Sequence, residues 1–114
     1  MSKTKADDRH FLFVCSMNKW RSPTGEKVWR DAFGLETRSC GTSSKARKTI
    51  SARDIQWADV ILVMEHKHKQ RIQAEFTRLV QYKPIDVLDI PDDYKFMDPE
   101  LVEIFKTVAE PYLR

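Results

Sequence analysis

The sequence predicts an α/β protein, a three-layer doubly wound sandwich built around a four-stranded parallel sheet. Four short segments with the composition of strands alternate with four segments in which apolar residues recur at helical spacing. Two of the strand segments are continuous apolar runs, which are typical of strands buried on both faces of a parallel sheet. With 114 residues the chain has room for one hydrophobic core. Right-handed helical crossovers between parallel strands then give this architecture.

The first half of the chain begins with an apolar run at 11–15 (FLFVC), which predicts a buried strand. A polar loop follows. Ser22 and Pro23 then predict a helix with serine as its N-cap and proline as its first helical residue. Gly34 predicts the end of this helix, and a second strand is predicted at 36–40. The residues at helical spacing that should face the core are Val28, Trp29, Ala32 and Phe33.

The second half of the chain supplies two further strands and three helices. Ser51, followed by Asp54 three residues later, predicts a capped short helix. Asp98 and Pro99 predict the N-cap and the first residue of the last helix, which extends to residue 112. The remaining predicted segments are strands at 60–64 (VILVM) and 86–90 and helices at 51–57 and 67–81.

Composition and charge predict a single cytoplasmic domain at 10–114, preceded by a flexible tail at 1–9. No apolar run approaches the roughly 20 residues that span a bilayer, and the polar N-terminus lacks the apolar stretch of a secretory signal, so we expect no membrane partner. Cys15 and Cys40 are too few for a disulfide scaffold and predict free thiols. The net charge of +3 suits an anionic substrate but does not predict nucleic-acid binding.

The segment that indicates chemistry joins the first strand to the first helix. Cys15 ends a buried strand, and Arg21, six residues later, opens a helix. This spacing alone arises readily by chance, but a six-residue loop in this position can surround one tetrahedral anion. Its backbone N–H groups and the helix N-terminus would bind the anion and favour the thiolate form of the cysteine. Arginine adds a bidentate grip on two phosphate oxygens.

Four segments resemble the low-molecular-weight protein tyrosine phosphatases, a family with the phosphatase I-like fold. The signature loop is the most specific match, and the likeness extends from residue 11 to the last helix. The segments are 14–23 (VCSMNKWRSP), 39–43 (SCGTS), 57–64 (WADVILVM) and 90–94 (IPDDY). The resemblance implies an enzyme that hydrolyses phosphotyrosine or aryl phosphate monoesters through a phosphocysteine, without a metal or cofactor, and releases inorganic phosphate.

The same resemblance implies a role for each residue of the loop. Cys15 would attack phosphorus, and Arg21 would bind the phosphoryl oxygens. Asn18 would hold the loop in a left-handed turn, which asparagine tolerates, with Ser39 as its hydrogen-bond partner. The hydroxyl group of Ser22 would stabilise the thiolate. The other residues of the phosphate-binding loop are Ser16, Met17, Lys19 and Trp20.

A general acid must protonate the phenolate as it leaves, and three aspartates are candidates. Asp92 is our first choice, because it lies two residues past the fourth predicted strand, at the sheet edge that also carries Cys15. Asp93 is second. Asp98 is third, because it already serves as the predicted cap of the last helix. Tyr94 and Trp20 are the expected aromatic walls of the pocket.

The sequence departs from the family in three places. The connection at 43–51 is short, so that basic residues replace an aromatic-bearing loop at the rim. Met17 stands where the family has glycine, and Trp20 where a second cysteine is common. His66 and His68 lie two apart on a predicted helix and point in different directions, so we interpret them as part of a charged solvated face rather than as metal ligands.

Two other functions remain open from the sequence. An arsenate reductase on the same fold also uses a loop cysteine, but it needs further cysteines, and Cys40 is the only spare one. A non-catalytic phosphate- or phosphotyrosine-binding module would keep the loop without the reaction. The presence of Cys15, Arg21 and Asp92 together favours a phosphatase acting on a phosphotyrosine protein or a small aryl phosphate.

Overall fold

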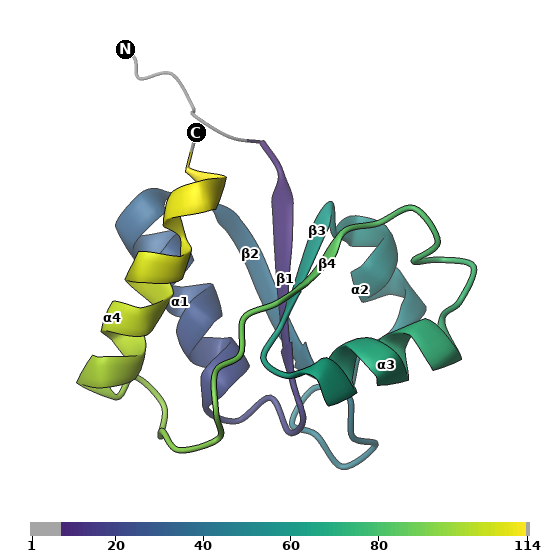
Figure 1. The fold of residues 1–114 in the computed structure, drawn as a ribbon, viewed down its shortest axis with the longest axis horizontal. Helices are drawn as coiled ribbons and strands as arrows, with labels where there is room; N and C mark the ends of the chain where they lie inside the picture. The colour runs from purple at the N-terminus through teal and green to yellow at the C-terminus, as the bar shows by residue number, and fades with distance from the viewer. Residues whose placement is uncertain (1–7, 114) are drawn as a thin grey trace.

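Four parallel strands form the sheet of the computed structural model, which describes residues 8–113 (Figure 1). The order across the sheet is β2-β1-β3-β4, and every neighbouring pair is parallel. The strands are β1 (His10–Cys15), β2 (Glu36–Gly41), β3 (Val60–Val63) and β4 (Ile85–Val87). Most of the tail predicted at 1–9 lies outside the described residues.

Helices cover both faces of this sheet, as Figure 1 shows. The sheet has α1 and α4 on one face and α2 and α3 on the other, so the predicted three-layer doubly wound fold is confirmed. The bounds are α1 (Arg21–Phe33), α2 (Ala52–Trp57), α3 (His66–Glu75), α4 (Pro99–Val108) and a short 3-10 helix, η1 (Glu110–Tyr112). No helix within residues 8–113 combines the length and the apolar character that crossing a membrane requires.

The central strand β1 is buried on both faces, as its apolar sequence predicts. Alternate side chains point to opposite faces. Phe11 and Phe13 pack into the layer of α1 and α4, whereas Leu12 and Val14 pack into the layer of α2 and α3. Trp29 of α1 meets the ring of Phe13 edge to face at 4.9 Å. These contacts place β1 between the two layers of helices.

Two helix caps form as predicted. The hydroxyl group of Ser51 accepts a hydrogen bond from the Asp54 amide, and the carboxylate of Asp54 accepts one from the Ser51 amide, so the capping box of α2 is complete. Asp98 caps α4 by accepting from the amide of Glu100. Gly34 adopts the left-handed conformation that ends α1, with a φ of 67°.

The predicted start of α1 was wrong by two residues. Trp20 is the N-cap residue and makes no side-chain capping bond, so Arg21 is already helical and Ser22 lies inside the first turn. The reason is that the Ser22 hydroxyl group bonds to Cys15 and Asn18 rather than to the backbone amides of its own helix.

Three further boundaries differ from the prediction by three residues or more. The last helix, predicted to extend to residue 112, ends at Val108, and the 3-10 helix η1 follows it. α3 ends at Glu75 rather than at 81, because the backbone of Phe76 leaves the helical region with a φ of −127° and a ψ of 39°, and turns occupy the chain from 77 to 82. β4 ends at Val87 rather than at 90, because Asp89 turns the chain with a φ of 57°. The apolar side chains that follow α3 and β4 still pack against the core as predicted. Their spacing reflects which side chains face the core, whether or not the helix or strand continues through them.

Replacing Ser51 by alanine should destabilise the protein by about 1 kcal/mol, because one of the first amides of α2 loses its acceptor. The corresponding fall in Tm is about 4 °C, measured by thermal unfolding followed by circular dichroism. Ser44→Ala in the exposed 42–49 loop is the matched control and should unfold like the wild type. Equal Tm values for the two variants would contradict this role of Ser51.

Candidate active site

A cavity opens at the C-terminal edge of the sheet, where β1 leads into α1. Its volume is about 240 Å3. Cys15, the last residue of β1, lies at its base, and the loop 16–20 forms one wall. The residues around the cavity are Cys15, Ser16, Met17, Lys19, Trp20, Arg21 and Asp92. The structure therefore brings together six residues of the predicted loop and the preferred acid.

The loop is held from outside by the segment that follows β2. Four consecutive carbonyl oxygens accept hydrogen bonds from this segment, which directs them away from the cavity. Those of Cys15, Ser16 and Met17 accept from the amides of Thr42, Ser43 and Arg47, and that of Asn18 accepts from the Arg47 side chain, at 2.9–3.0 Å. The amide of Asn18 points inward instead and donates to the Cys15 Sγ at 3.2 Å. Arg47 is one of the basic residues of the short 43–51 connection that were predicted at the rim, and it supports the loop instead.

Gly41 makes this close approach possible. A Cβ atom at this position would lie 2.5 Å from the Ser16 carbonyl oxygen and 2.9 Å from the Asn18 amide nitrogen. Both are backbone atoms of the loop, which could not move aside without leaving its shape. The last residue of β2 therefore has to be glycine for the loop to rest against it.

Asn18 organises the polar side chains beneath the loop. Its φ of 54° is the predicted left-handed turn. Its amide nitrogen Nδ2 donates to the hydroxyl oxygens of both Ser22 and Ser39, each at 2.9 Å. Ser39 in turn donates to the carboxylate of Glu26 at 2.6 Å. The pairing of Asn18 with Ser39 agrees with the expectation from the sequence, whereas Glu26 was missed, because nothing in the helical pattern of α1 distinguishes it from a surface glutamate.

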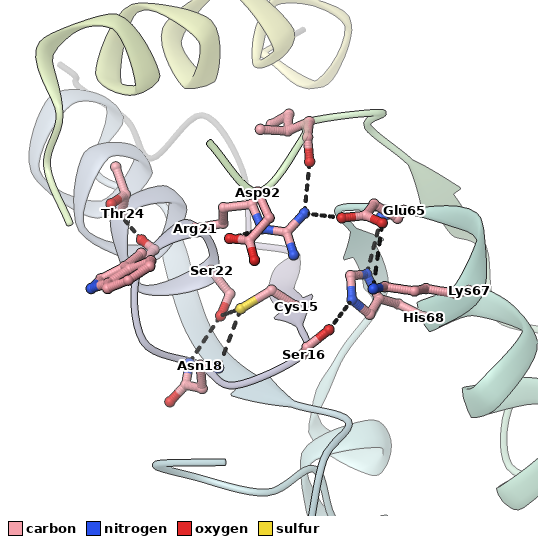
Figure 2. Close-up of polar contacts among 12 residues, drawn as sticks. Cys15, Ser16, Asn18, Arg21, Ser22, Thr24, Glu65, Lys67, His68 and Asp92 are labelled. Carbon is pink, nitrogen blue, oxygen red and sulfur yellow. Dashed lines mark hydrogen bonds and ion pairs between the residues drawn. The ribbon is translucent and has the colours of Figure 1, made fainter. Parts of the chain in front are cut away.

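This chain of hydrogen bonds determines what the Ser22 hydroxyl group can do. Its oxygen accepts from Asn18, and its hydrogen has two acceptors within reach, the Cys15 sulfur at 3.0 Å (Figure 2) and the Cys40 carbonyl oxygen at 3.3 Å. Together with the Asn18 amide, the sulfur thus has two donors within reach. Both can donate to a sulfur anion at the base of the cavity.

Arg21 is buried, and its guanidinium is aligned by acceptors from the segments that follow β3 and β4. Its side chain is 2% exposed. Nη1 donates to the carboxylate of Glu65, just after β3, and to the Ile90 carbonyl oxygen at 2.7 Å. Nε lies 3.5 Å from the carboxylate of Asp92. Figure 2 shows the guanidinium between Glu65 and Asp92, on the same side of the loop as Cys15.

Glu65 is a second residue that the sequence analysis missed. Burial opposes its charge, but the hydrogen bond and the positive charge of Arg21 hold the pKa of its carboxyl group below the usual range. Its position directly after the third predicted strand, at the edge that carries Cys15, is a signal that could have identified it.

His68 contradicts the prediction of a solvated histidine. Its ring is buried, whereas His66 is exposed as predicted. Nδ1 accepts from the amide of Glu65 at 3.0 Å, so Nε2 carries the hydrogen and donates to the Ser16 hydroxyl oxygen at 2.9 Å. Burial and the nearby charge of Arg21 lower the pKa of this imidazole to about 4. The helical periodicity of α3 could not reveal this, because the ring turns back to cap its own helix.

The three candidate acids occupy different environments. Asp92 lies on the cavity and is 63% exposed, which leaves room for a substrate oxygen or water beside it. Asp93 is exposed beside the cavity but does not line it, and Asp98 is occupied as the cap of α4. Tyr94 packs against the core beneath α4 and donates to Glu100 at 3.1 Å, whereas Trp20 does line the cavity.

Cys40 lies apart from this cavity. Its side chain packs in the layer of α2 and α3, on the face of the sheet opposite the cluster that includes Cys15. Both cysteines are free, and burial raises the pKa of the Cys40 thiol well above its usual range. Within residues 8–113, no three His, Cys, Asp or Glu side chains gather in a way that could hold a metal ion.

Solved structures of phosphatases share this fold. Wzb from Vibrio vulnificus in complex with benzylphosphonate superposes with a TM-score of 0.75 at 20% identity, over 94% of this chain and 98% of that chain. SP-PTP, a low-molecular-weight protein tyrosine phosphatase from Streptococcus pyogenes, gives 0.74 at 18% identity, over 93% and 94%. The arginine phosphatase YwlE from Geobacillus stearothermophilus gives 0.69 at 21% identity, over 91% and 92%.

At these identities the likeness shows the fold, and it is the fold that the sequence resemblance predicts. A scan against models of protein families found no match. A search among curated proteins found none either.

The buried His68 predicts a loss of stability in mild acid. In the unfolded chain its pKa returns to about 6.5, so between pH 6.5 and 4 the unfolded state binds more protons than the folded state. The free energy of unfolding should therefore fall as the pH falls through this window. In His68→Asn, which keeps an acceptor for the Glu65 amide, this contribution is absent, and about 1–2 kcal/mol of the acid-dependent loss should disappear.

Urea unfolding at pH 7 and at pH 4.5 measures this difference. His66→Asn removes an exposed histidine from the same helix and is the control, with a pH profile like that of the wild type. Parallel profiles for the wild type and His68→Asn would show that His68 does not titrate in the way its surroundings imply.

Proposed function

We propose that this protein is a phosphatase that hydrolyses phosphotyrosine or other aryl phosphate monoesters through a phosphocysteine intermediate. One observation carries the proposal. The Cys15 sulfur accepts a hydrogen bond from the Asn18 amide and lies 3.0 Å from the Ser22 hydroxyl oxygen, at the base of a cavity that Arg21 and Asp92 also line. The phosphatase fold of the structural neighbours supports it.

In the first step the thiolate of Cys15 attacks phosphorus. The S–P bond forms while the P–O bond to the aryl group breaks, and its electron pair passes to the aryl oxygen. Asp92, in its carboxylic acid form, donates a proton to this oxygen, so that a neutral phenol leaves. Arg21, aligned through Nη1 by Glu65 and Ile90, offers its remaining nitrogens to the phosphoryl oxygens as their charge redistributes.

In the second step a water molecule attacks the phosphocysteine. The carboxylate of Asp92 takes a proton from this water, the O–P bond forms, and the S–P bond breaks with its electrons returning to sulfur. The products are inorganic phosphate and the regenerated thiolate of Cys15. The exposure of Asp92 gives water direct access to the carboxylate that must activate it.

The walls of the cavity favour an aryl substrate. Trp20 and the exposed Met17 both line it, and a flat ring can pack against an indole and a thioether. The neighbours of known specificity act on either tyrosine or arginine phosphates, so the fold alone does not choose between them. The indole of Trp20 is the feature of this chain that supports the aromatic ester.

Neither alternative function gains support from a particular residue. An arsenate reductase would need a second thiol near the first, and Cys40 is fully buried on the opposite face of the sheet. A binding module would not require a carboxylate at the mouth of the cavity, where Asp92 lies.

The variant Cys15→Ser should lower the turnover of para-nitrophenyl phosphate by about 10⁴-fold or more, because the nucleophile is lost. Inorganic phosphate should still bind, as calorimetric titration would detect, because the loop amides and Arg21 remain. The control Cys40→Ala removes the second thiol and should keep its turnover. Absence of turnover in the wild type, or turnover in Cys15→Ser close to that of the wild type, would overturn the proposal.

The role of Asp92 can be tested with leaving groups of different basicity. Asp92→Asn should lower kcat for phenyl phosphate by about 10²- to 10⁴-fold. It should affect para-nitrophenyl phosphate much less, because the nitrophenolate leaves without a proton. Stopped assays of both esters give the ratio, and Asp93→Asn and Asp98→Asn are the matched controls. A larger and leaving-group-dependent loss in either control would transfer the acid role to that residue.

A further inference from the structure

We propose that a basic groove beside the Cys15 cavity binds an acidic segment of a protein substrate, close in sequence to its phosphorylated residue. The groove has a volume of about 450 Å3 and runs along the exposed side of α1. Besides Pro23, the residues that line it are Lys19, Glu26, Lys27, Arg30, Arg47 and Phe96. This inference rests on the proposed phosphatase function and adds the class of substrate.

The groove and the cavity adjoin at Lys19, which lines both. Its ammonium group lies 5.0 Å from the centre of the Trp20 ring, which also lines the cavity. A chain that leaves the cavity past Lys19 therefore enters the groove directly.

The positive charge of the groove is only partly neutralised. Four cations line it, against one carboxylate, that of Glu26, which accepts a hydrogen bond from Ser39 and lies 3.9 Å from Arg30 Nη1. Lys27 and Arg30 pair with Asp31 at 2.8 and 3.3 Å, but this aspartate lies outside the groove. All three of these side chains are about half exposed, and such surface pairs are weak. A carboxylate of the substrate can therefore compete for the two cations.

The length of the groove sets where the acidic residues should be. α1 leads from Arg21 in the cavity to Arg30 in the groove, nine residues along the helix and about 14 Å. An extended peptide covers this distance in about four residues. Acidic residues within about four positions of the phosphorylated residue would thus reach Lys27 and Arg30.

One wall of the groove is apolar. Phe96 is 48% exposed and belongs to the loop that also carries Asp92. An exposed aromatic side chain beside several cations suits a peptide with an apolar residue among its acids. The mixed surface favours a peptide over a nucleic acid, which would meet a carboxylate, Glu26, among the cations.

Binding of labelled phosphotyrosyl peptides to Cys15→Ser tests the inference by fluorescence anisotropy. One peptide carries four glutamates before the phosphotyrosine, one carries four after it, and a third has alanines at all these positions. We expect one of the acidic peptides to bind about five- to tenfold more tightly than the alanine peptide. Equal affinities for all three, or tighter binding of a single-stranded oligonucleotide of equal charge, would overturn the inference.

Charge reversal in the groove locates the effect. Lys27→Glu/Arg30→Glu, added to Cys15→Ser, should abolish the preference for the acidic peptide. Arg78→Glu/Lys106→Glu, which makes the same change in net charge at exposed positions away from the groove, should keep it. Lys27→Ala/Arg30→Ala is a milder variant in case the reversal unfolds α1. A preference that survives both groove variants would contradict the assignment.

With Cys15 intact, the same pairs should hydrolyse para-nitrophenyl phosphate like the wild type, because this ester is too small to reach the groove. If the wild type fails to hydrolyse this ester, the proposed reaction is refuted but the groove inference is not, because peptide binding is measured separately. If the ester is hydrolysed and the peptides bind equally, the groove inference alone fails.

Discussion

The left-handed turn at Asn18 is the constraint on which the rest of the site depends. A non-glycine residue in this conformation costs about 1–2 kcal/mol, and the hydrogen bonds of Asn18 to Ser22 and Ser39 offset that cost. The turn directs the Asn18 amide toward the Cys15 sulfur while the surrounding carbonyl oxygens face the segment after β2. Because these bonds cross from α1 to β2, the loop is shaped by the packing of two elements that flank it. The close contact at Gly41 follows from the same turn.

A buried guanidinium imposes the second constraint, since a charge without partners cannot remain in the interior. Glu65 follows β3 and Ile90 follows β4, so the ends of both strands hold Arg21. The parallel order of the sheet is what places these groups around one point, together with Cys15 at the end of β1. In the proposed reaction Arg21 therefore needs no reorientation when the phosphoryl group arrives, and the sheet itself supplies the preorganisation.

The sequence predicts best where one local signal agrees with the core. The strand before Cys15 and the capping box at Ser51 were predicted from local signals, because apolar runs and caps depend on few neighbours. The turn at Asn18 was expected from the family resemblance instead. The sequence predicts poorly where a side chain has two possible partners. Ser22 has the position of a cap but bonds to the thiol, and His68 has the pattern of a solvated helix but turns inward to Ser16. Such choices depend on groups that are distant in the chain, which periodicity does not encode.

The groups at the base of the cavity and the groups around it differ in charge, and this difference separates the reaction from the binding of the substrate. At the base of the cavity the sulfur has neutral donors, and the imidazole of His68, which holds Ser16, is itself kept neutral by burial and by Arg21. Arg21 is the one formal positive charge among the groups described at the base, while the other cations lie at the mouth and in the groove, with Lys19 at the junction. Charges at the mouth act over a longer range and are screened by salt. They can therefore govern which phosphorylated segment arrives without altering how the thiolate reacts.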